Sequence, residues 1–298
     1  MYQSLHLDKL TVPGFARVEV VETSPSTNTD LVAAVRADPA AWPAPSALIA
    51  EHQTAGRGRA GRSWEMPPRA GLTVSVLLRP RVPAGALGWL PLLAGLAVAR
   101  TVSDGGVTAA VKWPNDVLLP AVDTVAGLGL YRKVAGILAE VVPAPPGANG
   151  AAPDGAAPDD AAPDDAAPDD AAPAVVLGIG LNVSQSADEL PVPTATSLAL
   201  AGYPGPDRTD VLVRLLGEVH AVVRRWEQAG GDAAAAGLLD EYTAVSATLG
   251  TRVRAELAGG SEVLDGEAVG LDESGALVVR LESGEERAVT AGDVWHLR

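Results

Sequence analysis

A run of alternating arginine and glycine residues constrains the fold of this chain more than any other part of its sequence. Residues 56–62 read Gly-Arg-Gly-Arg-Ala-Gly-Arg, and Trp64 follows this run. The glycines leave the backbone free and the guanidinium groups need anionic partners, so the run cannot be a buried core element. The sequence therefore predicts an exposed loop that binds an anion.

The segments on either side of this loop are expected to be neighbouring strands. Residues 46–51 form an apolar run that leads through Gln53 into the loop, and residues 72–78 alternate as a strand does. A connection of roughly twenty residues is long for a compact domain, and such loops are usually functional or disordered. Nonspecific RNA binding is an alternative for this loop, although it lacks the interleaved aromatic residues that stack on bases.

The composition of the chain excludes several classes of function. Its 298 residues include 22 lysines and arginines and 37 acidic residues, and the net charge of −15 argues against general nucleic-acid binding. The absence of cysteine excludes disulfides, thiolate zinc sites and a cysteine nucleophile. The sequence also has neither a secretory signal nor an unbroken apolar run of about 18 residues. We therefore expect a cytoplasmic protein that does not span a membrane.

An acidic repeat interrupts the chain near its middle. Residues 151–175 repeat the pattern Ala-Ala-Pro-Asp-Asp with a period of five and contain seven aspartates. Proline in each repeat prevents a continuous helix, and the repeat lacks large apolar side chains that a core could bury. We expect a disordered, partly extended insertion at about residues 143–174, with a functional acidic segment as the alternative.

Three consecutive polar residues precede a predicted helix near the N-terminus. Residues 17–21 alternate with a β-branched bias and predict a strand, and residues 31–36 predict a helix. Ser26, Thr27 and Asn28 lie where that helix starts. They either cap its free N–H groups or contact a ligand beside its N-terminus.

A second polar group follows a short predicted strand at residues 107–111. Lys112 ends this strand, and Pro114 stops its backbone hydrogen bonding. Asn115 and Asp116 are therefore displayed at the end of the strand, either in a simple turn or in a binding site.

Lysine is scarce in this arginine-rich chain, which contains only Lys9, Lys112 and Lys133. We interpret each remaining lysine as a position where the planar guanidinium of arginine would not serve. Lys133 enters a predicted strand over residues 131–141, and residues 175–183 predict its antiparallel partner.

The predicted partner strand carries two glycines on one face. Gly178 and Gly180 are two residues apart, so another group can approach the backbone there, unless the strand is simply packed tightly. Sixteen residues separate Asp116 from Lys133, and we expect residues 120–130 to loop outward.

The remaining segments predict helices followed by short strands. Apolar residues at helical spacing predict helices over residues 86–102, 209–228 and 233–247. From residue 249 the pattern changes to short alternating strands, which suggest a small barrel. The turns between them are expected at residues 259–260, 272–275 and 282–284.

Five of these motifs together resemble the biotin protein ligases in order and spacing. They are Ser26-Thr27-Asn28, the loop at 56–62 with Trp64, residues 112–116, residues 133–138 and residues 178–182. The resemblance implies an α+β fold, in which residues 1–247 form a class II synthetase-like catalytic domain with a mixed sheet. Residues 248–298 would then form a small SH3-like β-barrel domain.

The resemblance also implies an activity and a set of site residues. Members of the family activate biotin with ATP to biotinyl-5′-AMP and transfer the biotinyl group to a lysine of a biotin carboxyl carrier protein or domain. Because the biotin carboxylate and the α-phosphate repel one another, this chemistry needs fixed cations rather than a protein nucleophile. By resemblance the catalytic residues are Lys133, Arg57 and Arg59. Those implied for biotin are Ser26, Thr27, Asn28, Gln53, Gly56, Arg57, Arg59, Lys133, Gly136 and Gly178, and those for ATP are Arg59, Arg62, Trp64, Lys112, Asn115, Asp116, Lys133 and Asn182.

The implied ligands and partners follow from the same resemblance. ATP and Mg²⁺ are expected, with Asp116 as the candidate magnesium ligand, and no tightly bound prosthetic group is expected. Ala60 stands where the family commonly has a basic residue. The insertion falls near a dimer contact of relatives, so we expect a monomer or weak homodimer. Residues 1–16 leave no room for the DNA-binding module that some members carry, so no DNA partner is expected.

Two other functions remain open from the sequence. A lipoate–protein ligase would share the fold and the adenylation chemistry, although the small barrel and the arginine loop favour biotin. A non-enzymatic RNA-binding protein would use the same arginines, but it gives no reason for Lys133 or for the paired glycines.

Overall fold

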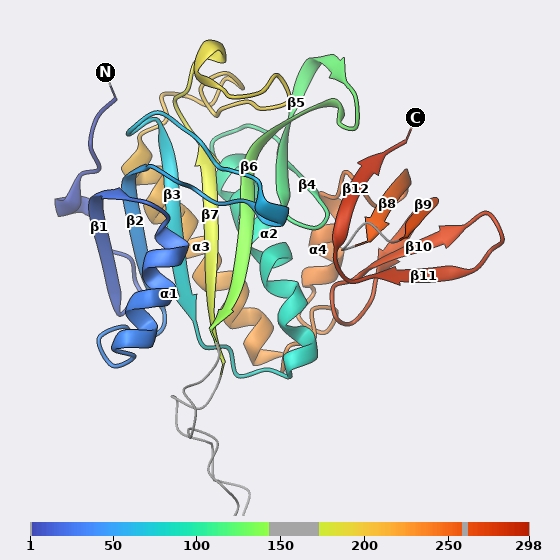
Figure 1. The fold of residues 1–298 in the computed structure, drawn as a ribbon, viewed down its shortest axis with the longest axis horizontal. Coiled ribbons are helices and arrows are strands. Elements are labelled where there is room, and N and C mark those ends of the chain that lie inside the picture. Colours follow the sequence, from blue (N-terminus) through green and yellow to red (C-terminus); the bar gives the residue numbers. More distant parts are fainter. Residues whose placement is uncertain (1, 143–172, 258–261, 298) are drawn as a thin grey trace, which may run out of the picture.

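The computed structural model describes residues 2–142, 173–257 and 262–297 of the chain. The acidic repeat and the turn predicted at residues 259–260 lie outside the described residues. Two sheets organise the rest, and the helices pack around the larger one (Figure 1).

The larger sheet has seven strands in the order β1-β2-β3-β7-β6-β5-β4. Only β1 and β2 run parallel to one another, and all other neighbours in this sheet are antiparallel. The sheet is therefore mixed, as predicted. Its strands are β1 (Arg17–Ser24), β2 (Ser46–Gln53), β3 (Gly71–Leu78), β4 (Ala110–Lys112), β5 (Asp116–Val125), β6 (Gly129–Val142) and β7 (Ala174–Asn182).

Helices cover both faces of this sheet. Helix α1 (Thr27–Ala37) packs on one face against β2, β3 and β7, whereas α2 (Trp89–Ser103) and α3 (Arg208–Gln228) cover the other (Figure 1). The central strand β3 is consequently buried along its whole length. Its sequence nevertheless alternates, and the buried hydroxyl groups of Thr73 and Ser75 are hydrogen-bonded to the carbonyl of Ala50 and to Asn28 Oδ1.

The smaller sheet contains five antiparallel strands in the order β11-β10-β9-β8-β12. These strands are β8 (Arg252–Leu257), β9 (Val263–Leu271), β10 (Leu277–Leu281), β11 (Glu286–Val289) and β12 (Gly292–His296). They lie where the small barrel was expected. The α+β prediction with a mixed sheet is confirmed, and the small barrel predicted after it is a five-stranded antiparallel sheet in the structure.

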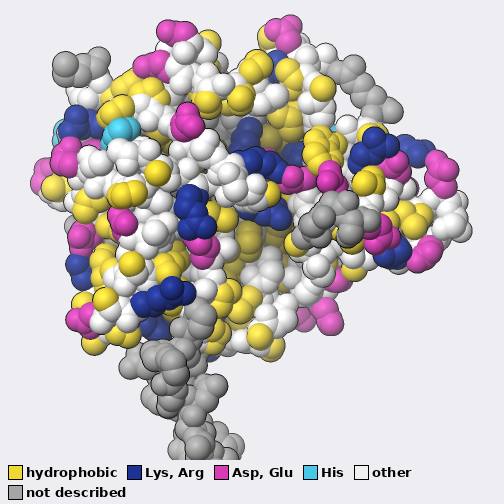
Figure 2. Space-filling view, in the orientation of Figure 1, with side chains coloured by type: hydrophobic (Ala, Val, Ile, Leu, Met, Phe, Trp, Pro, Cys, Tyr) yellow, Lys and Arg dark blue, Asp and Glu magenta, His cyan; other side chains and the backbone are white. Residues whose placement is uncertain are grey.

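Two buried tryptophans attach the smaller sheet to the larger one. The indole N–H of Trp89 donates to the carbonyl of Glu273 at 3.0 Å, and that of Trp113 donates to the carbonyl of Gly275 at 3.0 Å. A buried indole N–H needs an acceptor, so these contacts fix the position of the turn before β10. The junction between the sheets is a hollow that contains lysine and arginine side chains (Figure 2).

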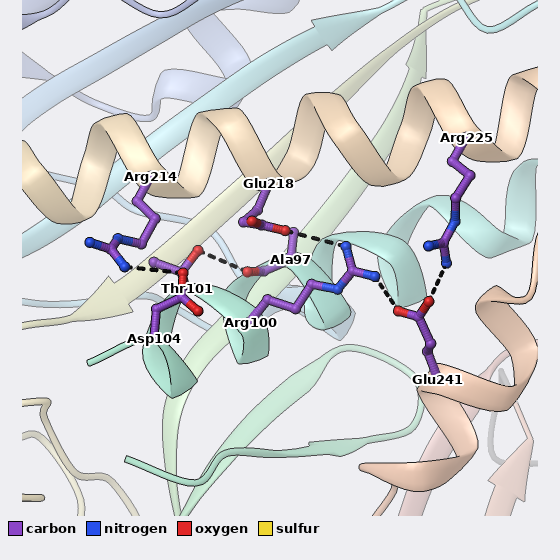
Figure 3. A network of polar contacts seen from close by, with 8 residues as sticks. All are labelled: Ala97, Arg100, Thr101, Asp104, Arg214, Glu218, Arg225 and Glu241. Atoms are coloured by element: carbon purple, nitrogen blue, oxygen red, sulfur yellow. Dashed lines mark hydrogen bonds and ion pairs between the residues drawn. The ribbon is translucent and has the colours of Figure 1, made fainter. Parts of the chain in front are cut away.

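Charged side chains connect three helices on the far face of the larger sheet (Figure 3). Arg100 on α2 pairs with Glu218 on α3 at 3.3 Å and also with Glu241 on α4 (Leu238–Ala244). Glu241 also pairs with Arg225 on α3 at 2.6 Å. These side chains are about one third exposed, so the network orients the helices more than it stabilises the fold.

Two predicted segments differ in the structure. The helix predicted over residues 233–247 is only the short helix α4, because Gly237 has a φ of +68° that ends helical continuity before Leu238. Residues 120–130 do not form an outward loop. They extend strands β5 and β6 into a hairpin that closes through a turn at residues 126–128.

One segment in the described part of the chain, Ala84–Ser103, is long and apolar enough to cross a membrane by composition. Of its most apolar window, 67% is buried inside the protein. The segment includes α2, which packs against the larger sheet and against α3 as a core helix.

Candidate active site

The arginine–glycine loop folds back on itself as a compact turn. The N–H of Gly58 donates to the carbonyl of Arg62 at 2.6 Å, and that of Trp64 donates to the carbonyl of Gly56 at 2.9 Å. A Cβ atom at Gly56 would lie 2.2 Å from the carbonyl oxygen of Trp64, so only glycine permits this closure. The loop thereby carries its arginines over the middle of the sheet.

A first cavity of about 100 Å³ lies under this loop. It is lined by every residue that the sequence assigned to biotin except Gly56, whose role is loop closure. Strands β3, β6 and β7 form its floor. The lining residues predicted from sequence are Ser26, Thr27, Asn28, Gln53, Arg57, Arg59, Lys133, Gly136 and Gly178.

A polar network runs along one side of this cavity. Gln53 Oε1 accepts from the N–H and the hydroxyl of Thr27 at 2.8 and 3.0 Å. The hydroxyl of Ser75 lies 2.8 Å from Thr27 Oγ1 and 2.6 Å from Asn28 Oδ1, and Asn28 Nδ2 donates to Glu140 at 2.9 Å. Ser26 lies at the N-cap position of α1 without a side-chain capping bond. Side chains from three strands, β2, β3 and β6, therefore hold the polar residues at the start of α1 in position.

Two glycines of β7 make room for side chains. A Cβ atom at Gly178 would lie 2.3 Å from Asn28 Oδ1, and one at Gly180 would lie 2.3 Å from the indole of Trp64. The sequence predicted that some group approaches the backbone at these glycines. In the structure those groups are Asn28 and Trp64.

For the acyl-adenylate formation that the family resemblance implies, replacing Gly180 with alanine is expected to slow the reaction about 10- to 100-fold, because the new methyl group must displace Trp64 and the loop that carries it. Single-turnover formation of the adenylate measures this effect. Gly217→Ala is the matched control, since a Cβ atom there meets nothing within 4 Å. An unchanged rate for Gly180→Ala would show that the position of Trp64 does not matter for the reaction.

A second, larger cavity of about 690 Å³ adjoins the first. It lies between the larger sheet, the hairpin of β5 and β6, and strand β12 of the smaller sheet. Seven of the eight residues that the sequence assigned to ATP line it, and Arg59 lines the first cavity instead. The seven are Arg62, Trp64, Lys112, Asn115, Asp116, Lys133 and Asn182.

Lys133 lies at the junction of the two cavities. It lines both of them, together with Arg62, Trp64 and Asn115. Its Nζ is 2.6 Å from Asp116 Oδ1 and 5.6 Å from the centre of the Trp64 ring. The ammonium group can therefore touch anionic groups bound on either side.

Arg57 pairs with Glu140 on β6 at 3.2 Å, whereas the other two arginines of the loop contact the smaller sheet. Arg59 donates to Asn115 Oδ1 at 3.1 Å and to the carbonyl of Gly292 at 3.4 Å. Arg62 pairs with Asp293. Lysine and arginine side chains consequently gather in the hollow at the centre of the face seen in Figure 2.

Burial disfavours the charged form of two cationic groups in the site. Lys112 is 8% exposed, its Nζ donates to the carbonyl of Val294 at 2.5 Å, and burial is the main cause that lowers its pKa. Burial also lowers the pKa of Arg59. A bound anion would favour the charged form of both groups and so oppose this effect of burial.

The comparisons with known proteins agree with this arrangement. The model of the biotin/lipoate A/B protein ligase family matches residues 20–151, and the model of the biotin protein ligase C-terminal domain matches residues 248–297. The biotin–[acetyl-CoA-carboxylase] ligase of Mycobacterium tuberculosis is 40% identical over 96% of this chain and 91% of its own. The chain belongs to the biotin protein ligase family. The sequence-based resemblance to this family is confirmed.

A solved structure and a relative of lower identity are also similar to this biotin protein ligase. The biotin protein ligase of Aquifex aeolicus in complex with biotin and ATP has a TM-score of 0.67 and 25% identity, covering 95% of this chain and 100% of that one. The bifunctional ligase/repressor BirA of Bacillus subtilis is 29% identical over 82% of this chain, which spans 64% of the length of that relative.

Sequence reasoning missed two groups of site residues in this family member. Ser75 and Glu140 complete the polar network, and each is an ordinary strand residue with no local signal. Asp293 and Trp295 on β12 line the second cavity although more than 150 residues separate them from Lys133 along the chain. Only the docking of the smaller sheet brings them there.

Proposed function

We propose that this chain is a biotin–[biotin carboxyl-carrier protein] ligase. The observation that carries the proposal is the position of Lys133 at the junction of the two cavities. The first cavity adjoins the polar network, and the second contains the side chains of Arg62 and Lys112. Biotin would occupy the first cavity and ATP the second. The complex of the Aquifex aeolicus relative with biotin and ATP supports this assignment of ligands.

The first half-reaction joins two anions. A carboxylate oxygen of biotin attacks the α-phosphorus of ATP, a new bond forms between them, and the bond to the pyrophosphate leaving group breaks. Charge develops on the phosphate oxygens, and preorganised cations stabilise it. Lys133, Arg57 and Arg59 would supply these cations, and the pairing of Lys133 with Asp116 at 2.6 Å holds its ammonium in place beforehand.

The second half-reaction transfers the biotinyl group. The amine of an acceptor lysine attacks the acyl carbon, the bond from that carbon to the phosphate oxygen breaks, and AMP leaves. One proton is released from the attacking nitrogen. The arginine loop would exclude water from the adenylate before this step, because Arg59 connects it to both sheets.

The described residues fit a magnesium ion that arrives with ATP. They contain no group of three or more His, Asp or Glu side chains able to hold a metal by themselves. Three carboxylates, Glu65, Asp116 and Asp293, nevertheless line the second cavity, and Asp116 and Asp293 are the two that lie beside its cations. Mg²⁺ typically takes one or two carboxylates together with substrate phosphates, so these two residues would hold it, and it would neutralise phosphate charge.

We further propose the domain boundaries, the cellular location and the oligomeric state of the protein. Residues 1–247 would form the catalytic domain and residues 248–298 the C-terminal domain. We infer a cytoplasmic monomer or weak homodimer. We also infer that it does not bind DNA, because a net charge of −15 opposes the phosphate backbone.

Mass spectrometry of an acceptor tests the proposed function. A purified biotin carboxyl carrier domain is incubated with the enzyme, ATP and either biotin or lipoate. We expect one biotinyl group on one lysine with biotin and no modification with lipoate. Modification by lipoate would favour the lipoate ligase, and modification by neither acid would contradict both ligases.

Replacing Arg59 with glycine is expected to release the adenylate about tenfold faster, because two hydrogen bonds that close the loop are lost. The escaping biotinyl-AMP should then label lysines of a bystander protein such as albumin, as measured by blotting for biotin. Ala60→Gly is the matched control, since Ala60 is exposed and its φ of +52° suits glycine. Equal bystander labelling by both variants would count against a closing role for Arg59.

A further inference from the structure

Exposed apolar side chains concentrate beside the second cavity. Eight large hydrophobic side chains in the described part of the chain are at least 40% exposed, and four of them lie on segments that form this cavity. We call these four the apolar rim. They are Val122 (94% exposed), Leu130 (52%), Val192 (49%) and Trp295 (40%).

The three segments that carry the apolar rim meet around the second cavity. Residues 126–128 at the tip of the β5–β6 hairpin, Val192 in the segment after β7 and Trp295 on β12 all line the second cavity. A Cβ atom at Gly127 would lie 3.3 Å from Trp295 Cδ1, so the hairpin tip touches the smaller sheet. In Figure 1 the hairpin projects between the segment after β7 and β12.

The fold does not need the exposed part of the hairpin. Between the pairs Pro120–Tyr131 and Val125–Gly129 the register shifts, so that residues 121–124 oppose Leu130 alone. The guanidinium of Arg132 donates to the carbonyl of Asp123 at 2.9 Å and holds this irregular segment. Irregular strand segments are common beside functional sites, and exposed apolar side chains that gather together mark interaction sites.

The charges near the apolar rim suit a basic nucleophile. Glu65 and Asp293 line the second cavity, where Asp293 pairs with Arg62, and Asp123 lies on the hairpin beside Val122. Carboxylates of this kind attract a lysine ammonium and repel other acidic surfaces. Apolar contact area with acidic groups around it fits the protein surface that presents the acceptor lysine.

We propose that the apolar rim is the docking surface for the acceptor domain. This inference rests on the proposed function, because the docked protein is the one whose lysine attacks the acyl carbon. The rim borders the cavity that reaches Lys133, so a domain seated on it can extend a lysine towards the activated carboxyl group. Adenylation needs only small molecules, and Val122 and Leu130 of the rim line neither of the cavities that would hold them.

Kinetics of the two half-reactions separate this role from adenylation. The double variant Val122→Asp/Leu130→Asp changes two exposed residues that line neither cavity. We expect kcat/KM for a purified biotin carboxyl carrier domain to fall about tenfold or more, through a higher KM for that domain. Biotin-dependent exchange of pyrophosphate into ATP, and transfer of the biotinyl group to hydroxylamine, should stay at the wild-type rate.

Leu7→Asp is the matched control, because Leu7 is 63% exposed and lines neither cavity. It should leave all three rates unchanged. Unchanged acceptor kinetics in the double variant would overturn the docking proposal, and so would an equal loss of pyrophosphate exchange and acceptor labelling. Absence of pyrophosphate exchange in the wild type is a separate result that would contradict the proposed function itself.

Discussion

Replacement of Lys133 by alanine is expected to lower the rate of biotinyl-AMP formation by about 10²- to 10³-fold, the range observed when one preorganised charge-stabilising group is removed. Lys133 lines both cavities, whereas Arg57 and Arg59 line only the first. No other lysine in the chain lines the first cavity, because Lys112 lines the second and Lys9 lines neither. Rapid-quench single-turnover assays measure the effect.

Two variants control this prediction. Lys9→Ala removes an exposed lysine from a short helical turn and should leave the rate unchanged. Lys133→Arg keeps the charge but replaces the compact ammonium by a planar group, so we expect only partial activity. Full activity of the Lys133→Ala variant would show that Lys133 does not take part in the reaction.

Replacement of Arg208 by methionine is expected to lower the free energy of unfolding by about 3–5 kcal/mol, as when one partner of a buried ion pair is removed. The side chains of Arg208 and Glu51 are 6% and 3% exposed, and Arg208 Nη2 lies 2.7 Å from Glu51 Oε2 as an ion pair outside hydrogen-bond geometry. Arg208 also donates to the carbonyls of Gly71 and Gln3 at 2.9 and 3.0 Å. It therefore joins α3, β3 and the N-terminal segment, and its loss leaves a buried carboxylate without a cation.

Thermal and denaturant unfolding monitored by circular dichroism measure this loss. Arg214→Ala is the matched control, since Arg214 and its partner Asp104 are 44% and 53% exposed, and such pairs contribute about 0–1 kcal/mol. The double variant Glu51→Leu/Arg208→Met should recover much of the stability, because no buried charge remains. If the Arg208→Met variant is as stable as the wild type, water must reach the carboxylate of Glu51.

Local sequence patterns predicted most elements of the larger sheet. Strand β7 is largely an apolar run, and β3 alternates apolar residues with Thr73 and Ser75. The prediction of one helix over residues 233–247 was wrong because its alanines have a high helix propensity at any position. In the structure Gly237 has a positive φ, and α4 begins after it. Propensity alone does not locate such a boundary.

The candidate site was predictable only where its residues form local motifs. The loop arginines, Lys112 to Asp116 and Lys133 each occur in short distinctive runs, and the structure brings them to two adjoining cavities. Glu140 and Trp295 contribute through pairing and docking between distant segments, which no local pattern encodes. The β5–β6 hairpin was read as a loop because its bulged, exposed residues lack regular alternation.

Exchange of labelled pyrophosphate into ATP by the purified wild-type protein tests the central claim most directly, because it reports reversible adenylation without an acceptor. We predict that the label enters ATP when biotin is present, and that it does not enter when biotin is omitted or replaced by lipoate. No exchange with biotin, or equal exchange with lipoate, would contradict the proposal that the two cavities joined at Lys133 activate biotin with ATP.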